Sequence, residues 1–132
     1  MSFINTENGH IQLSSTLTIQ PFADYDELIE LLKQHSLEYV HENRYNLYQY
    51  IIISRFKTEN KSFLLDIYFD KKKLKSISLG FSCDAGFEES YETWLANLTG
   101  SQTNFEWGTI RLEEHPKYNV PFINMQYKQD AI

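Results

Sequence analysis

The sequence predicts an α+β fold in which two helices pack on an antiparallel sheet of about six to seven strands. The first observation is the stretch from Tyr45 to Ser82, which holds three runs of alternating apolar and polar residues joined by short polar turns. The second is a pair of segments, 25–35 and 87–98, whose apolar residues recur with helical spacing. Because successive side chains of a strand point to opposite sides, each alternating run has one apolar face that the helices must cover.

The N-terminal part predicts one strand followed by one helix. Gly9–Gln20 alternates cleanly between apolar and polar residues, which predicts a strand with a bend at Ser14–Ser15. Asp24 is placed as a helix N-cap, and Glu27 three residues later completes the pattern of a capping box. The leucine-rich segment that follows predicts a helix over Tyr25–His35.

The middle of the chain predicts four strands. We expect a short strand at Leu37–His41 and then a turn marked by Asn43 and Asn46. The three-stranded meander follows, with Asp70–Lys73 as the solvated turn between its second and third strands. The second meander strand places four apolar side chains on one face: Phe63, Leu65, Ile67 and Phe69.

The C-terminal part predicts a second helix and two closing strands. Apolar residues between Phe87 and Leu98 share one helical face, and Gly100 lies just past the expected end, where positive φ is common. Phe105–Leu112 and Val120–Tyr127 are the predicted closing strands. The expected order is therefore β-α-β-β-β-β-α-β-β, in a single domain of residues 1–132.

Composition predicts a globular protein of the cytoplasm. The chain is 42% hydrophobic and 15% aromatic, which suffices for a packed core. No apolar run approaches the roughly 20 residues that span a bilayer. The first ten residues have neither the basic nor the apolar region of a signal peptide. The single cysteine, Cys83, excludes an internal disulfide and fits a reducing compartment.

Charge is distributed unevenly along the chain. The formal net charge is −6. Residues 1–54 carry seven acids and two bases, residues 55–75 carry three acids and seven bases, and residues 84–114 carry seven acids and one base. An acidic protein is repelled by phosphate backbones, so this balance argues against nucleic acid as a direct partner. A basic protein surface is the better candidate.

The residues that could carry chemistry do not form a catalytic or cofactor motif. The four histidines lack metal-type spacing: His10, His35, His41 and His115. The glycines are isolated, so no phosphate loop is present, and we expect neither a metal nor a cofactor. An enzymatic alternative rests on Cys83 as a nucleophile or on Asp66 and Asp70 as paired carboxylates. The structural interpretation, which we favour, is a buried or strand-end cysteine and solvent-facing carboxylates.

An acidic cluster near the second predicted helix is the feature most typical of a partner-binding surface. It comprises Asp84, Glu88, Glu89 and Glu92, with Tyr91 as a candidate aromatic anchor. Such carboxylates attract a basic partner and raise its association rate. The structural alternative is that they complement the helix dipole and keep the protein in solution.

Four tyrosines surround the first strand of the meander: Tyr39, Tyr45, Tyr48 and Tyr50. They support two interpretations. One is a stacking surface for a small ligand, and the other is amphipathic strand residues with the ring buried and the hydroxyl exposed. The first interpretation keeps small-ligand binding as an alternative function.

The second half of the chain resembles a set of small bacterial proteins with a Trp-Leu helix ending in Leu-x-Gly, an aromatic-x-Trp-Gly-x-Ile strand, a charged turn and an alternating strand ending in Tyr. Here the turn is 115–119, His-Pro-Lys-Tyr-Asn, where the family tends to Asp-Pro-Lys-x-Gly. The matching residues are Trp94, Leu95, Leu98, Gly100, Phe105, Trp107, Gly108, Ile110, Ile123, Met125 and Tyr127.

The resemblance implies an immunity protein of a polymorphic or contact-dependent toxin system. Such a protein is not an enzyme; it neutralises a cognate toxin domain, here expected to be basic, by covering the toxin's active site with an acidic surface. The matching positions are packing residues, so no toxin-binding residue carries over from the family. Small-ligand binding and a small hydrolase-type activity remain the alternatives.

Overall fold

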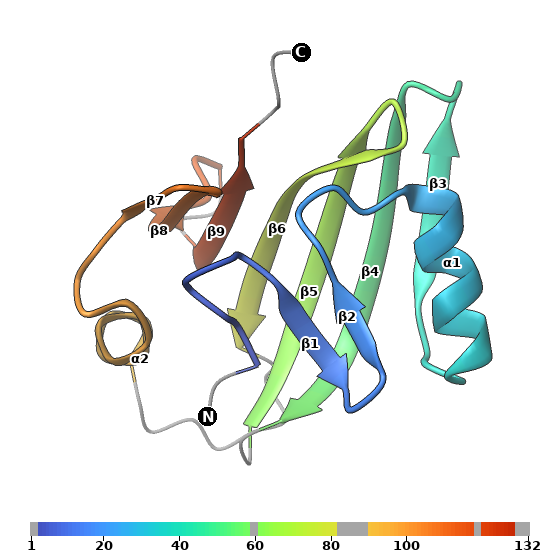
Figure 1. Ribbon diagram of the computed structural model, residues 1–132. Coiled ribbons are helices and arrows are strands. Elements are labelled where there is room, and N and C mark those ends of the chain that lie inside the picture. Colours follow the sequence, from blue (N-terminus) through green and yellow to red (C-terminus); the bar gives the residue numbers. More distant parts are fainter. Residues whose placement is uncertain (1–2, 59–60, 82–89, 118–119, 129–132) are drawn as a thin grey trace.

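The computed structural model describes residues 3–58, 61–81, 90–117 and 120–128, and it has the predicted α+β architecture (Figure 1). Neither described helix has the length and apolar character needed to cross a membrane. In chain order the elements are β1 (Ile11–Ser14), β2 (Leu17–Ile19), α1 (Tyr25–Gln34), β3 (Val40–Arg44), β4 (Tyr48–Thr58), β5 (Lys61–Asp70), β6 (Lys73–Phe81), α2 (Tyr91–Thr99), β7 (Asn104–Phe105), β8 (Gly108–Glu114) and β9 (Pro121–Tyr127).

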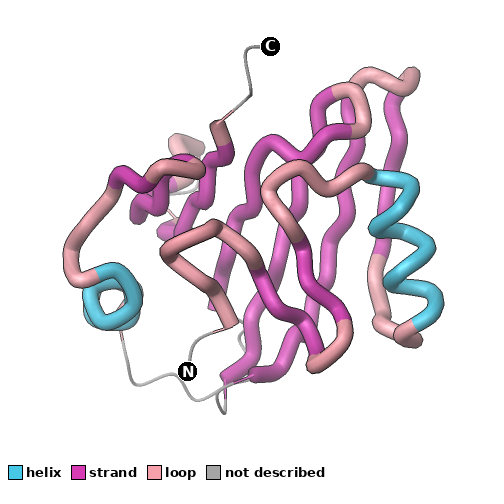
Figure 2. The backbone as a smooth tube through the Cα atoms, viewed as in Figure 1, coloured by secondary structure: helices cyan, strands magenta, loops and turns pink. Residues whose placement is uncertain are grey.

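Seven antiparallel strands form the main sheet in the order β3-β4-β5-β6-β9-β8-β7. The β1–β2 hairpin is a separate two-stranded sheet and lies with α1 over one face of the main sheet (Figures 1 and 2). Helix α2 packs at the side of the molecule against β8 and β9. The other face of β4, β5 and β6 carries no described helix, and we call it the open face.

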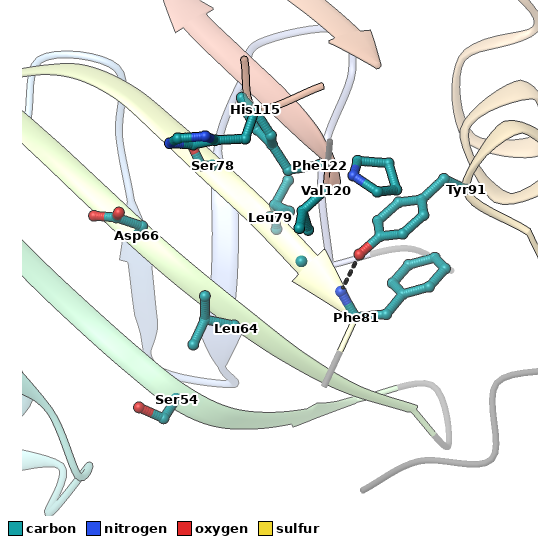
Figure 3. Close-up of a pocket in the computed structure, with 12 residues that line it drawn as sticks. Ser54, Leu64, Asp66, Ser78, Leu79, Phe81, Tyr91, His115, Val120 and Phe122 are labelled. Atoms are coloured by element: carbon teal, nitrogen blue, oxygen red, sulfur yellow. Dashed lines mark hydrogen bonds between the residues drawn. The ribbon is translucent and has the colours of Figure 1, made fainter. Parts of the chain in front are cut away.

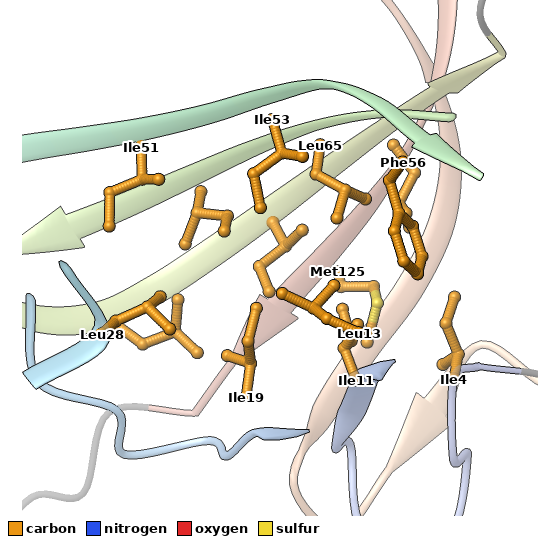
Figure 4. Close-up of a cluster of buried hydrophobic side chains, with 14 of the residues drawn as sticks. Ile4, Ile11, Leu13, Ile19, Leu28, Ile51, Ile53, Phe56, Leu65 and Met125 are labelled. Carbon is orange, nitrogen blue, oxygen red and sulfur yellow. The ribbon is translucent and has the colours of Figure 1, made fainter. Parts of the chain in front are cut away.

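The core lies between the main sheet and the layer formed by the hairpin and α1. The four apolar residues that the period of two placed on one side of β5 are all fully buried, which confirms that part of the prediction. Ile51, Ile53 and Leu65 reach from the sheet toward Ile19 and Leu28 on the opposite layer (Figure 4). Side chains therefore fill the space beneath the sheet.

Helix α1 begins and ends close to the predicted residues. Asp24 is its N-cap and accepts a hydrogen bond from the Glu27 N–H at 3.2 Å. The start of this acidic helix lies against the lysine-rich turn between β5 and β6. There Lys72 pairs with Asp26 at 2.9 Å and Lys73 with Asp24 at 3.6 Å. Acids of the N-terminal segment 1–54 are thus paired in the fold with lysines of the basic segment 55–75.

The predicted single strand over Gly9–Gln20 is wrong, because the chain folds back on itself there as the β1–β2 hairpin. Ile11 lies opposite Ile19, and the Thr16 N–H donates to Ser14 Oγ at 3.2 Å within the turn. The hairpin turns the apolar sides of both strands toward the main sheet. It therefore covers the core instead of extending an edge of the sheet.

Three other boundaries differ from the prediction. The second helix begins at Tyr91, where the Ser90 hydroxyl accepts the Thr93 N–H as an N-cap; the predicted start at Phe87 lies outside the described residues. The short strand β3 begins and ends about three residues later than expected. The single strand predicted at Phe105–Leu112 is a β7–β8 hairpin, because the chain turns between Phe105 and Gly108.

Candidate functional site

The open face presents one side chain from each of several neighbouring strands in register. Val40, Ile52, Asp66, Ser78 and Asn124 are successive partners across β3, β4, β5, β6 and β9. In β4, β5, β6 and β9 their neighbours along the strand are buried in the core, so these four side chains point away from it, and Val40 continues the row into the exposed strand β3. This row runs across a surface that no described helix covers.

A hollow of about 490 Å³ lies on the open face beside this row (Figure 3). We call it the open-face hollow. Its walls come from β4, β5 and β6, from the first residue of α2, and from the segment around the β8–β9 connection. The lining residues are Ser54, Leu64, Asp66, Ser78, Leu79, Gly80, Phe81, Tyr91, His115, Val120, Pro121 and Phe122.

Asp66 is the carboxylate of this hollow. Its Oδ1 atom is buried and accepts no hydrogen bond from any group in the described part of the chain. Burial raises the pKa of Asp66 above its ordinary value of 3.8. A second hollow, of about 340 Å³ and bounded by β3 and β4, also reaches Asp66. The carboxylate therefore stands between two depressions of the same face.

Tyr91 forms one wall of the hollow. Its ring stacks on Phe81 with centroids 4.1 Å apart and planes 6° apart, and its hydroxyl oxygen accepts the Phe81 N–H at 2.8 Å. The side chain is half-buried, so one ring face and the hydroxyl are already used inside the protein. The sequence predicted Tyr91 as an aromatic anchor, and the structure places it in the wall of a depression.

Two glutamates stand next to the same hollow. Glu113 lies opposite the lining residue Phe122 in the β8–β9 ladder and points to the open face, as does Arg111 opposite Asn124, whereas Glu114 points to the other side of β8. Glu92 follows Tyr91 in α2. The three glutamates are exposed and form no ion pair with the residues that the structure describes. The other members of the predicted acidic cluster, Asp84, Glu88 and Glu89, lie outside the described residues.

The tyrosines around the first meander strand separate into different surroundings. Tyr48 and Tyr50 each lie against Tyr68 on the open face, with ring centroids 6.3 and 5.2 Å apart. Tyr39 instead packs beside His41, at 5.7 Å, and Tyr45 is 90% exposed in a turn. Two of the four tyrosines therefore form an aromatic patch next to Asp66.

The residues of the enzymatic alternative are not brought together. Asp66 and Asp70 share one face of β5, but four strand residues place them roughly 13 Å apart. Asp70 does not line the open-face hollow. Cys83 lies outside the described residues. Among those that are described, no three His, Cys, Asp or Glu side chains gather as a metal site requires.

Sequence reasoning missed Leu64, Val120 and Phe122, which make the hollow apolar. A signal for one of them was present. Leu64 occupies a position of β5 whose period of two points away from the core, and it is 39% exposed. An apolar residue on the polar side of an alternating strand indicates a surface that contacts something else.

No protein-family model matches the chain, and no curated protein matches its sequence. A chain of a solved structure does match in fold, and that structure is described as "Rhs1-CT in complex with cognate immunity protein RhsI1". The superposition has a TM-score of 0.59 and covers 95% of this chain and 86% of that chain, at 16% sequence identity. The likeness is thus one of fold, shared with a chain of a complex between Rhs1-CT and its cognate immunity protein.

Proposed function

We propose that this protein is a non-enzymatic immunity protein that binds a bacterial toxin domain and covers the toxin's active site. The observation that carries the proposal is the shared fold with a chain of an immunity-protein complex, which extends over 95% of this chain. The resemblance of the segment Ser90–Tyr127 to small immunity-like proteins supports the same class.

The surface chemistry supports a basic toxin domain as the partner. The chain carries a net charge of −6, and two exposed glutamates, Glu92 and Glu113, stand next to lining residues of an apolar hollow on the open face. An apolar centre with a charged rim is the usual anatomy of a protein-binding surface. Carboxylates on that rim would hydrogen-bond lysine and arginine side chains of the toxin's substrate groove and so exclude its substrate.

We expect the gene directly upstream of this one to encode a large secreted protein, and the test uses the C-terminal domain of that protein as the candidate toxin. Expressed alone in a bacterial host, that domain should arrest growth, and co-expression of this chain should restore it. The two purified proteins should also elute as one complex. Growth arrest that persists in the presence of this chain, with no complex formed, would contradict the proposal.

The size of the hollow favours a second candidate, the binding of a small apolar ligand. A volume of about 490 Å³ falls within the range of ligand pockets. The filled core beneath the sheet leaves the open face as the place for such a ligand. Native mass spectrometry of the purified chain separates the candidates, because a ligand binder retains a small molecule and an immunity protein does not.

A further inference from the structure

We propose that the open-face hollow receives an arginine side chain of the toxin, whose guanidinium forms an ion pair with Asp66. This inference rests on the proposed function and deepens it. It gives the open face one defined occupant, namely a cationic side chain of a basic partner. It also gives a role to a carboxylate that the fold does not use.

The geometry isolates Asp66 from internal partners. It lies in β5, an inner strand of the main sheet, between Ile52 of β4 and Ser78 of β6 in the register. Its Oδ1 accepts no hydrogen bond from the described residues, and none of the residues that line the hollow is a lysine or arginine. A donor from outside can therefore approach this carboxylate through the hollows of the open face.

The Oδ1 atom of Asp66 is already shielded from water in the free protein, and this burial raises the pKa of the carboxyl group. An ion pair at an interface is normally weakened by the cost of desolvating both charges. Here folding has already desolvated one oxygen of Asp66, so part of that cost is met before the partner arrives. A cation that enters the hollow consequently gains more from pairing with Asp66 than with an exposed surface carboxylate.

The lining of the hollow favours arginine over lysine. Leu64, Val120 and Phe122 make its walls apolar, and Tyr91 contributes an aromatic ring. A guanidinium is flat, weakly hydrated and able to stack on aromatic surfaces, whereas an ammonium holds its water strongly. The long apolar stem of arginine can also pack along such walls.

Charges around the hollow favour the same occupant. Glu113 stands beside it in the β8–β9 ladder, opposite the lining residue Phe122, and Glu42 lines the second hollow that reaches Asp66. The other titratable side chains that line the two hollows with Asp66 are His115, Tyr91, His41 and Tyr50. A cationic side chain that approaches the open face thus meets carboxylates at both the rim and the floor.

The experiment measures the affinity of the upstream-encoded toxin domain for the wild-type chain and for Asp66→Asn. The substitution keeps the shape and removes the charge, and we expect a loss of affinity of at least about 30-fold. Asp70→Asn is the matched control, because Asp70 lies on the same strand and face outside the hollow, and it should change affinity less than about threefold. Ser78→Leu, which fills the hollow, should weaken binding without removing a charge.

A double-mutant cycle identifies the occupant. Each arginine and lysine of the toxin domain is replaced by alanine and combined with Asp66→Asn. One arginine should lose its contribution to affinity when Asp66 is already neutral. If wild-type binds and Asp66→Asn binds equally well, or if the coupling is to a lysine, this inference is overturned while the proposed function stands. If the wild-type chain does not bind at all, the proposed function fails first.

Discussion

At the scale of single residues, Asp66 has two opposite effects. Its charge lowers the stability of the free protein, and in our proposal the same charge strengthens binding of the partner. Burial raises its pKa above 3.8, so the folded state holds this proton more tightly than the unfolded chain does. The contribution of Asp66 to the free energy of unfolding is therefore most favourable below pH 3.8, where the carboxyl group is protonated in both states. This contribution is lost as the pH rises through the raised pKa of the folded state. At neutral pH, the ionised carboxylate therefore lowers the free energy of unfolding.

The first prediction is that Asp66→Asn raises the stability of the free protein at pH 7, because an amide has no charge to desolvate. The difference from wild-type should shrink as the pH is lowered to about 4, where Asp66 in both states takes up its proton. Urea denaturation of both proteins across this pH range measures the effect. Equal or lower stability of the variant at pH 7 would show that the carboxylate is compensated inside the fold.

The combination of two measurements gives this residue its diagnostic value. A substitution that stabilises the free chain and weakens toxin binding is the mark of a residue kept for function at the expense of stability. If Asp66 had a purely structural role, its replacement would lower the stability of the free chain. A misfolded variant would lose both stability and toxin binding. The two measurements therefore distinguish a functional residue, a structural residue and a misfolded variant.

At the scale of secondary-structure elements, the β5–β6 hairpin carries a backbone cost in its turn. Asp70 pairs with Lys73, and the two residues between them, Lys71 and Lys72, have φ values of 50° and 69°. Two central residues with positive φ form the turn type that matches the twist of the strands, but it normally contains asparagine or glycine. Hydrogen bonds from Lys71 N–H to Leu47 O and from Lys72 N–H to Gln49 Oε1 hold the lysines in place.

The second prediction is that Lys71→Gly stabilises the protein by about 0.5–1 kcal/mol, because glycine adopts positive φ without the clash of a Cβ. Lys57→Gly is the matched control, since Lys57 is an exposed lysine inside β4. There the added backbone freedom should cost about 0.5–1 kcal/mol. Thermal unfolding of both variants measures the changes, and a loss of stability in Lys71→Gly would contradict the account of the turn.

The sequence predicted most elements because period and capping are local properties. Phe63 and Phe69 repeat on one side of β5, and Asp24 caps α1, whatever the rest of the chain does. The β1–β2 hairpin escaped prediction for a physical reason. Its short turn leaves Leu13 and Leu17 in step with a period of two, so one long strand and two short ones give the same pattern.

The candidate site was less predictable because it depends on pairing between distant parts of the chain. Strand β9 inserts between β6 and β8, and Leu79 thereby lies opposite Ile123. Only this pairing brings Phe122 beside the strands that carry Leu64 and Asp66. A local pattern contains no information on which strand becomes the neighbour of β6. The sequence could thus indicate Tyr91 on its helix but not the hollow that Tyr91 lines.

At the scale of the whole molecule, the two faces of the sheet differ in what they offer a partner. The hairpin and α1 cover one face, and the acids at the start of α1 pair with lysines of the β5–β6 turn. The open face has an apolar hollow flanked by glutamates that form no ion pair with the described residues. If the proposed partner is a basic toxin domain, these carboxylates should steer it toward the open face.

The third prediction concerns this steering. Reversal of Glu88, Glu89 and Glu92 to lysine should lower the association rate of the toxin domain by about tenfold or more at low salt, and should flatten its dependence on ionic strength. The control is the same reversal of Glu27, Glu30 and Glu38, which lie in α1 and just after it, and it changes the net charge by the same amount. Stopped-flow binding at several salt concentrations separates local steering from net charge. If the two triple variants slow association equally, net charge alone would explain the effect; if only the control does, the toxin would bind the helical side.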